Sequence, residues 1–152
     1  RGYRCLYSGV DFSGWKATSG WRSHDWQFRF HGSKDEKDTS LESEELFDDY
    51  GFIFDVRVSE ETKPLAFQLR GKDISAIQVA PDMYKGVLLL KGRNWNRFEG
   101  ELRGNQLTLT LNDKKIFDGK KIDGLPVKGP IRIVPTGPIS MANIYVRPLD
   151  KL

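Results

Sequence analysis

Six side chains in the middle of the sequence are of types that carry out acid–base chemistry or bind polyhydroxylated ligands. A carboxylate can serve as a general acid or base, while arginine and glutamine offer hydrogen bonds to hydroxyl groups. A tryptophan (Trp95, or Trp26 nearer the N-terminus) offers a flat apolar surface for a ring. Asp55 is the candidate catalytic residue, and the candidate substrate-binding residues are Arg57, Gln68, Arg70, Gln78 and Trp95.

Three successive predicted strands carry five of these six side chains. Residues 52–58, 65–70 and 74–80 alternate apolar and polar side chains, the pattern of strands with one buried and one open face. If the three strands are neighbours in one sheet, their polar side chains share its open face. The sequence therefore predicts one polar patch made of Asp55, Arg57, Gln68, Arg70 and Gln78.

The pattern of the rest of the chain also predicts short strands separated by turns. The clearest hairpin is formed by residues 96–103 and 106–112, which flank Gly104-Asn105, a dipeptide suited to a two-residue turn. No segment keeps a helical period, so crossover helices for a parallel sheet are lacking. These observations predict an all-β fold, an antiparallel sandwich of two sheets.

Length and composition limit the possible functions. The chain has 152 residues, a size expected for a single domain spanning 1–152. A formal net charge of +3 is too small to predict nucleic-acid binding, and no apolar run is long enough to span a membrane. The chain starts at Arg1, so we expect a processed product or a piece cut from a longer protein.

No cofactor or metal site is predicted. Cys5 is the single cysteine, which excludes an intrachain disulfide and a paired-cysteine zinc site. Five acids lie between Glu42 and Asp49, but they lack the ligand spacing and turn glycine of a calcium loop. A solvated acidic surface is the simpler interpretation. The lysines near residues 114–128 are interpreted in the same way, as charges that protect a sheet edge.

Six segments, in chain order, resemble successive motifs of one known family. Residues 7–16 contain a Gly-Trp loop, residues 95–99 begin a strand with Trp-Asn, and residues 129–133 and 141–146 form two closing strands. The other two segments are residues 40–52 and 109–113. The six segments resemble the 3-keto-disaccharide hydrolase domain family, and the resemblance covers roughly residues 6–149. The resemblance implies a concanavalin-A-like jelly roll whose concave face takes carbohydrate. It also implies a bacterial protein exported to the periplasm or the extracellular space.

The sequence departs from this family at positions that bear on catalysis. The family's Asn-Ser-Gly is replaced by Pro64-Leu65-Ala66, and its Glu is replaced by Ala76, although Arg70 and Gln78 are kept. Cleaving an ordinary glycoside needs two carboxylates, and only Asp55 lies on the predicted face. The sequence therefore favours a divergent member that binds glycan with catalysis reduced or lost. The alternatives are an active hydrolase or lyase on 3-keto-glycosides, and a structural or protein-interaction sandwich.

Overall fold

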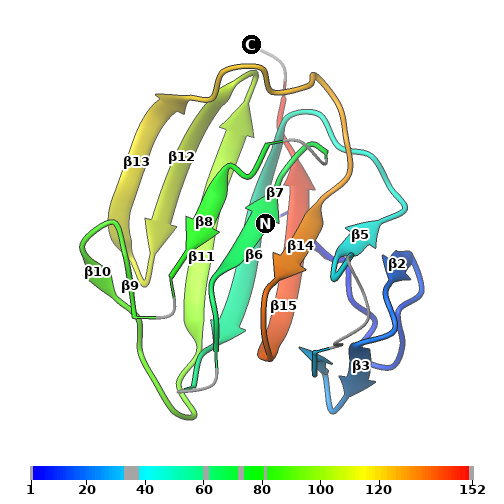
Figure 1. Ribbon diagram of the computed structural model, residues 1–152. Helices are drawn as coiled ribbons and strands as arrows, with labels where there is room; N and C mark the ends of the chain where they lie inside the picture. Colours follow the sequence, from blue (N-terminus) through cyan, green and yellow to red (C-terminus); the bar gives the residue numbers. More distant parts are fainter. Residues whose placement is uncertain (1, 33–37, 60–61, 72–73, 81, 151–152) are drawn as a thin grey trace.

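The protein is a sandwich of two antiparallel β-sheets, here called sheet A and sheet B (Figure 1). A computed structural model describes residues 2–32, 38–59, 62–71, 74–80 and 82–150. All of the described regular structure is β-strand, as the sequence predicts, and no helix in this part of the chain is long and apolar enough to cross a membrane.

Sheet A contains eight strands and forms the rear layer in Figure 1. Seven of them follow the order β13-β12-β11-β6-β15-β4-β3, and β1 pairs with the end of β15. The strands are β1 (Arg4–Cys5), β3 (Trp21–His24), β4 (Gln27–Phe30), β6 (Tyr50–Arg57), β11 (Asn96–Arg103), β12 (Gln106–Leu111), β13 (Lys114–Lys121) and β15 (Ile139–Pro148).

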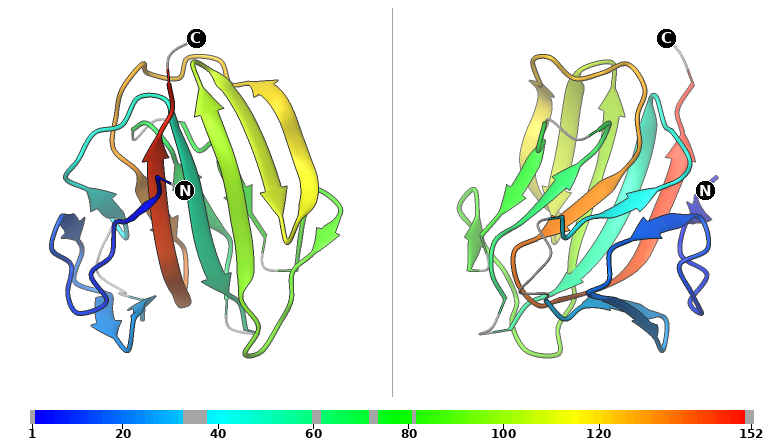
Figure 2. Two further views of the ribbon diagram at one scale, coloured as in Figure 1. Left: turned by 180° about the vertical axis from the view of Figure 1, so that it is seen from behind. Right: turned by 45° about the vertical axis from the view of Figure 1, so that its right-hand side comes forward.

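Sheet B contains five strands and lies in front of sheet A, as the three views together show (Figures 1 and 2). Their order is β2-β5-β14-β7-β8, and a separate two-stranded hairpin, β9–β10, follows β8. The strands of sheet B are β2 (Trp15–Ala17), β5 (Leu41–Ser43), β7 (Leu65–Gln68), β8 (Ile77–Val79) and β14 (Arg132–Pro135). The hairpin consists of β9 (Met83–Tyr84) and β10 (Val87–Leu88).

The predicted hairpin in the middle of the chain is confirmed. β11 and β12 pair from Phe98 opposite Leu111 to Arg103 opposite Gln106. Gly104, the first turn residue, has φ +55°, a conformation that glycine adopts without the steric cost of a Cβ. The apolar faces of both strands point into the sandwich, because Phe98, Leu102 and the three leucines of β12 are buried.

Aromatic rings join the two sheets across the core. Phe54 of β6 stacks on Phe67 of β7 with ring centroids 5.0 Å apart, and Phe67 also lies 5.7 Å from Phe98 of β11. None of these three side chains is exposed to solvent. The sequence pattern therefore correctly placed Phe54 and Phe67 on the apolar faces of their strands. The apolar face of β6 in sheet A packs against the apolar face of β7 in sheet B.

Phe67→Ala tests this contact between the layers. Removing the ring leaves a cavity against Phe54 and Phe98, so we expect a loss of about 3–5 kcal/mol in the free energy of unfolding. Urea denaturation measures it, with Leu88→Ala as the control at a side chain that is 67% exposed. The control should stay within about 0.5 kcal/mol of the wild type, and equal losses in the two variants would contradict the assigned core.

Candidate functional site

The structure divides the six predicted site residues among three places. β6, with Asp55 and Arg57, belongs to sheet A, whereas β7 and β8, with Gln68 and Gln78, belong to sheet B. Since Phe54 and Phe67 meet inside the sandwich, the polar sides of β6 and β7 point to opposite surfaces of the molecule. The prediction of one shared polar patch is therefore wrong.

Asp55 lies on the outer side of sheet A but is only 3% exposed. Arg97 of β11 donates to both carboxylate oxygens, from Nε at 2.9 Å and from Nη2 at 2.8 Å, and Asn143 Nδ2 donates at 2.7 Å. The hydrogen bond to Asp55 raises the pKa of Arg97. Both carboxylate oxygens of Asp55 are thus occupied by hydrogen-bond donors of the protein itself. Asp55 has the geometry of a cross-strand charge network.

Arg57 and Trp95 lie on this same outer side of sheet A. The guanidinium carbon of Arg57 sits 4.2 Å from the centroid of the Trp95 ring, a cation–π contact. Arg57 therefore covers a face of the half-buried Trp95 ring, and a sugar stacking on that face would first have to displace the guanidinium.

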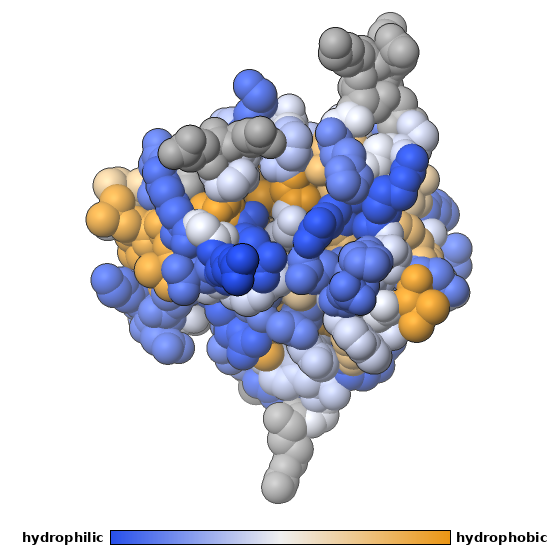
Figure 3. Space-filling model, turned by 90° about the horizontal axis from the view of Figure 1, so that it is seen from below, coloured by the Kyte–Doolittle hydropathy of each residue, from blue (hydrophilic) through white to orange (hydrophobic). Residues whose placement is uncertain are grey.

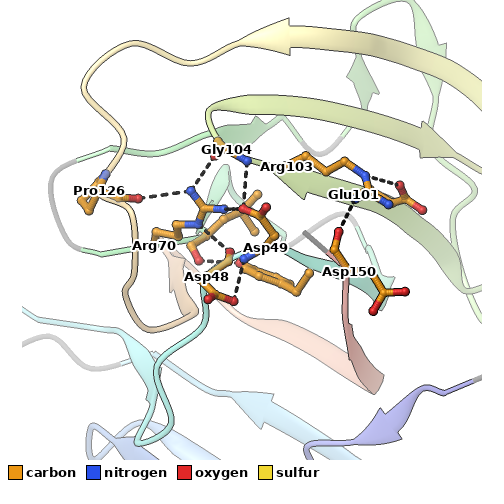
Figure 4. A network of polar contacts seen from close by, with 10 residues as sticks. Asp48, Asp49, Arg70, Glu101, Arg103, Gly104, Pro126 and Asp150 are labelled. Atoms are coloured by element: carbon orange, nitrogen blue, oxygen red, sulfur yellow. Dashed lines mark hydrogen bonds and ion pairs between the residues drawn. The ribbon is translucent and has the colours of Figure 1, made fainter. Parts of the chain in front are cut away.

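Arg70 lies inside the protein at one end of the sandwich and is 2% exposed. Its guanidinium donates to the carbonyl oxygens of Asp48 at 2.7 Å, Gly104 at 2.5 Å and Pro126 at 3.2 Å, and to Asp49 Oδ1 at 2.8 Å (Figure 4). These four bonds connect distant segments of the chain. The structure thus places Arg70 away from both outer faces, in contrast to the surface position that the sequence predicts.

Gln68 and Gln78 remain together on the outer side of sheet B. Gln78 is exposed and lies opposite Ala66 in the pairing of β8 with β7. Gln68 donates from Nε2 to Ser75 Oγ at 3.2 Å, and its Oε1 accepts from Arg132 Nη1 at 2.9 Å. The two glutamines thus belong to one face, and its centre is Arg132, which no pattern in the sequence singles out.

Arg132 of β14 organises this face. Its Nη2 donates to Ser40 Oγ at 2.8 Å and approaches Asp38 Oδ1 at 3.4 Å, and its Nε lies 2.9 Å from Glu42 Oε1. Lys16 Nζ lies 3.7 Å from the second oxygen of Glu42. These charged groups, with Ala17 and Thr18, line a hollow of about 310 Å³.

A second hollow on sheet B, of about 380 Å³, is mainly apolar. Ala66, Gln78 and Val134 are cross-strand neighbours in its floor, because Ala66 pairs with Gln78 on one side and with Val134 on the other. Val134 and Arg132 are two residues apart on β14, so they point to the same side and the two hollows adjoin. The lining residues are Pro64, Leu65, Ala66, Gln78, Val79, Ala80, Val134 and Thr136. Figure 3, seen from below, shows apolar surface recessed among hydrophilic side chains on the side of sheet B.

A larger hollow, of about 480 Å³, lies beside β1, β2 and β5 rather than on the outer side of sheet B. The charged groups in its wall are largely engaged, since Arg4 pairs with Glu45 and its guanidinium carbon lies 5.9 Å from the centroid of the Phe47 ring. The two adjoining hollows on sheet B bring charged and apolar groups together within one open face, so we take that face as the candidate site.

The acid-rich stretch from Glu42 to Asp49 is dispersed by the fold. Glu42 pairs with Arg132, Glu45 with Arg4, and Asp49 with Arg70. In the part of the chain that the structure describes, no group of three or more His, Cys, Asp or Glu side chains is arranged to hold a metal ion.

Comparison with known proteins establishes the fold. No protein-family model matches the sequence, and no curated protein matches it. Among solved structures, a "putative glycosyl hydrolase" of Parabacteroides distasonis aligns with a TM-score of 0.79 at 16% identity, covering 98% of this chain and 94% of that one. The carbohydrate-binding module CBM66 of Bacillus subtilis aligns at 0.66 and 12% identity, covering 88% and 95%. The VIP36 exoplasmic/lumenal domain, in its Ca2+/Man3GlcNAc-bound form, aligns at 0.65 and 10%, covering 99% and 90%. The two-sheet lectin-like sandwich expected from the sequence is therefore confirmed, while the 3-keto-disaccharide hydrolase family itself is not.

Arg70→Leu separates a structural role from a ligand-binding role. The variant leaves Asp49 without its cation and three carbonyl groups without donors, so we expect a loss of about 3–5 kcal/mol in unfolding free energy. Arg103→Leu is the matched control: its ion pair with Glu101 is partly exposed, and its loss should amount to less than about 1 kcal/mol. Urea denaturation distinguishes them. A stable Arg70→Leu protein would contradict the role that the geometry assigns to Arg70.

Proposed function

We propose that this chain is a carbohydrate-binding β-sandwich domain that takes glycan on the outer side of sheet B. The observation that carries the proposal is that the charged hollow around Arg132 and the apolar hollow around Ala66 lie on the same side of sheet B. A pyranose ring has C–H faces and a rim of hydroxyl groups, so it suits a surface that is apolar in one part and rich in hydrogen-bonding groups in the next.

The polar groups of this face are held in place before a ligand arrives. Gln68, Ser40 and Glu42 fix the Arg132 guanidinium from three sides. A fixed guanidinium loses little conformational entropy on binding, which favours affinity. Gln78 and Lys16, both exposed, then offer hydrogen bonds at the two ends of the face.

The known structures with this fold support a glycan ligand. They include a protein named as a carbohydrate-binding module and a lumenal domain solved with Man3GlcNAc. The alignment with the Parabacteroides protein extends over almost the whole of both chains, which supports one sandwich domain as the binding unit. We further propose an exported location, extracellular or periplasmic, and neighbouring domains in a longer protein.

The departures from the 3-keto-disaccharide hydrolase family support a binding domain with reduced or lost catalysis. Pro64, Leu65 and Ala66, which replace the family's Asn-Ser-Gly, all line the apolar hollow. A polar turn has thus been exchanged for apolar groups at the proposed ligand surface. Ala76 cannot act as an acid or base in place of the family's Glu.

Ala66→Tyr tests the binding face, because a phenol ring at this position fills the apolar hollow while tyrosine remains compatible with a strand. A glycan array first identifies a ligand, and calorimetric titration then compares the variant with the wild type. We expect affinity at least about tenfold weaker, which is ~1.4 kcal/mol. Thr110→Tyr, on the outer side of sheet A, is the matched control and should bind normally. No glycan bound by the wild type, or normal binding by Ala66→Tyr, would overturn the proposal; the first result would favour a structural or protein-interaction sandwich.

A second candidate function, cleavage of a glycoside on the same face, is favoured by one observation. Glu42 and Asp38 both approach the Arg132 guanidinium, so two carboxylates lie near each other where the proposed ligand binds. This pair replaces Asp55 as the site that an enzyme would use.

Glu42→Gln tests the cleavage hypothesis with a 3-keto-glucoside as substrate. If the hypothesis holds, the wild type releases sugar and Glu42→Gln releases at least about a hundredfold less, the usual scale for losing an acid–base group. Glu99→Gln, an exposed carboxylate of sheet A, should retain full activity. If the wild type does not turn over the substrate, the cleavage hypothesis is contradicted and only the binding function remains.

A further inference from the structure

We propose a second sugar-binding site, separate from sheet B, in which the exposed face of Trp26 stacks on a sugar ring. Trp26 occupies the two-residue turn of the β3–β4 hairpin, between His24 and Gln27, which pair with each other. β3 lies at the lower right of Figure 1 and belongs to sheet A. Trp26 lines neither hollow of sheet B, so the proposal does not depend on that site.

The backbone of this turn is unusual for a tryptophan. Asp25 and Trp26 have φ +49° and +62°, as in a type I′ turn, where both central residues are left-handed. The equivalent second positions in the β9–β10 and β12–β13 hairpins are Gly86 and Asp113, residue types common in such turns. For a bulky side chain this conformation costs about 1–2 kcal/mol. A strained residue of this kind persists only where its surroundings hold it, and such residues cluster at ligand sites.

The surroundings of Trp26 hold the turn in two ways. The Tyr7 hydroxyl hydrogen-bonds to Ser23 and donates to the carbonyl oxygen of Gln27 at 2.9 Å, which ties the hairpin to the chain entering the Gly9 turn. The six-membered part of the Trp26 ring then lies against Gly9, where an added Cβ would be 2.0 Å from Cε3. Gly9 thus lets the backbone support one face of the ring.

The other face of the ring is open to solvent. Trp26 is 69% exposed, whereas Trp15 and Trp21 are buried and Trp95 is half-buried beneath Arg57. Exposing an indole costs hydrophobic free energy, so the turn combines two unfavourable features, backbone strain and an exposed ring.

Size and polarity indicate what this ring binds. The exposed apolar surface at this tip comes from Trp26 and Val10, far less than the ~800 Å² per partner of a stable protein interface. The residues that precede Trp26 are polar, with His24 Nε2 2.9 Å from Asp25 Oδ2, and both side chains are exposed. An indole ring with polar side chains beside it suits a pyranose ring, because the sugar can place its C–H bonds on the indole and its hydroxyl groups against the polar side chains.

Trp26→Gly is the informative substitution, because it removes the ring and also relieves the turn. We expect the variant to unfold at the same or a higher urea concentration than the wild type, since glycine adopts positive φ without strain. Cellohexaose and maltohexaose serve as probes. We expect one of them to protect part of the tryptophan fluorescence from iodide quenching in the wild type. Calorimetric titration, which does not depend on Trp26 emission, should show one binding site fewer in Trp26→Gly. Trp26→Phe, which keeps a ring, should retain part of the binding.

The same assay distinguishes this site from the sheet B site. Ala66→Tyr should keep the probe's protection of Trp26, since the two surfaces are separate. Loss of protection in Ala66→Tyr would show a single site and overturn the proposal. It would equally be overturned if neither probe protected the wild type, or if Trp26→Gly bound as the wild type does. Protection that depends on Trp26, together with glycan binding unaffected by Ala66→Tyr, would support this proposal and overturn the one for sheet B.

Discussion

The buried guanidinium of Arg70 is the contact on which one whole end of the sandwich depends. Its four hydrogen bonds join the segment entering β6, the β11–β12 turn and the segment before β14 to the end of β7 (Figure 4). Asp49 also accepts from the backbone nitrogen of Gly104 at 2.8 Å, so one carboxylate neutralises the cation and fixes the turn. Close packing adds to this constraint, since a Cβ on Gly129 would lie 2.5 Å from the Arg70 carbonyl group. A buried charge with one compensating partner tolerates little rearrangement, so the ends of both sheets are held in one relative position.

The two outer faces differ in how far their polar groups satisfy one another. On sheet A, Asp55 is held by Arg97 and Asn143, and Arg57 covers Trp95. Sheet B also has an ion-pair network around Arg132, but it borders an apolar floor and two hollows. Sheet A also has a hollow, of about 350 Å³, beside Glu99 and Arg147. Sheet B differs in having an apolar hollow and a charged hollow on the same side, so both kinds of contact are available there.

Local pattern in the sequence predicted the strands but not their partners. Period-two alternation correctly placed Phe54 and Phe67 inside and Asp55 and Gln68 outside, because burial of one face depends only on neighbouring residues. It could not tell that the connection from β6 to β7 crosses from one sheet to the other, which reverses the surface to which the polar side points. Consecutive strands often pair, and that expectation failed here.

Arg132 illustrates the limit of local pattern for the site. Its signal in the sequence was a single arginine between Ile131 and Ile133 in a short apolar strand. Its importance comes from Asp38, Glu42 and Gln68, which are distant in sequence and meet it only through the pairing of β14 with β5 and β7. Arg70 was misjudged for the complementary reason: its polar side chain extends past the last residue of β7 into the interior, where it binds carbonyl groups instead of facing water.

The position of β13 at the end of sheet A bears on how copies of this protein meet one another. β13 pairs with β12 on one side, and its lysines 114, 115, 120 and 121 are exposed. Two copies aligned antiparallel along this strand would set ammonium groups of one against those of the other, and like charges directly opposite destabilise such pairing. Polymer growth through this border is therefore opposed by charge repulsion, and that opposition weakens as ionic strength rises, because dissolved salt screens the ammonium groups from each other.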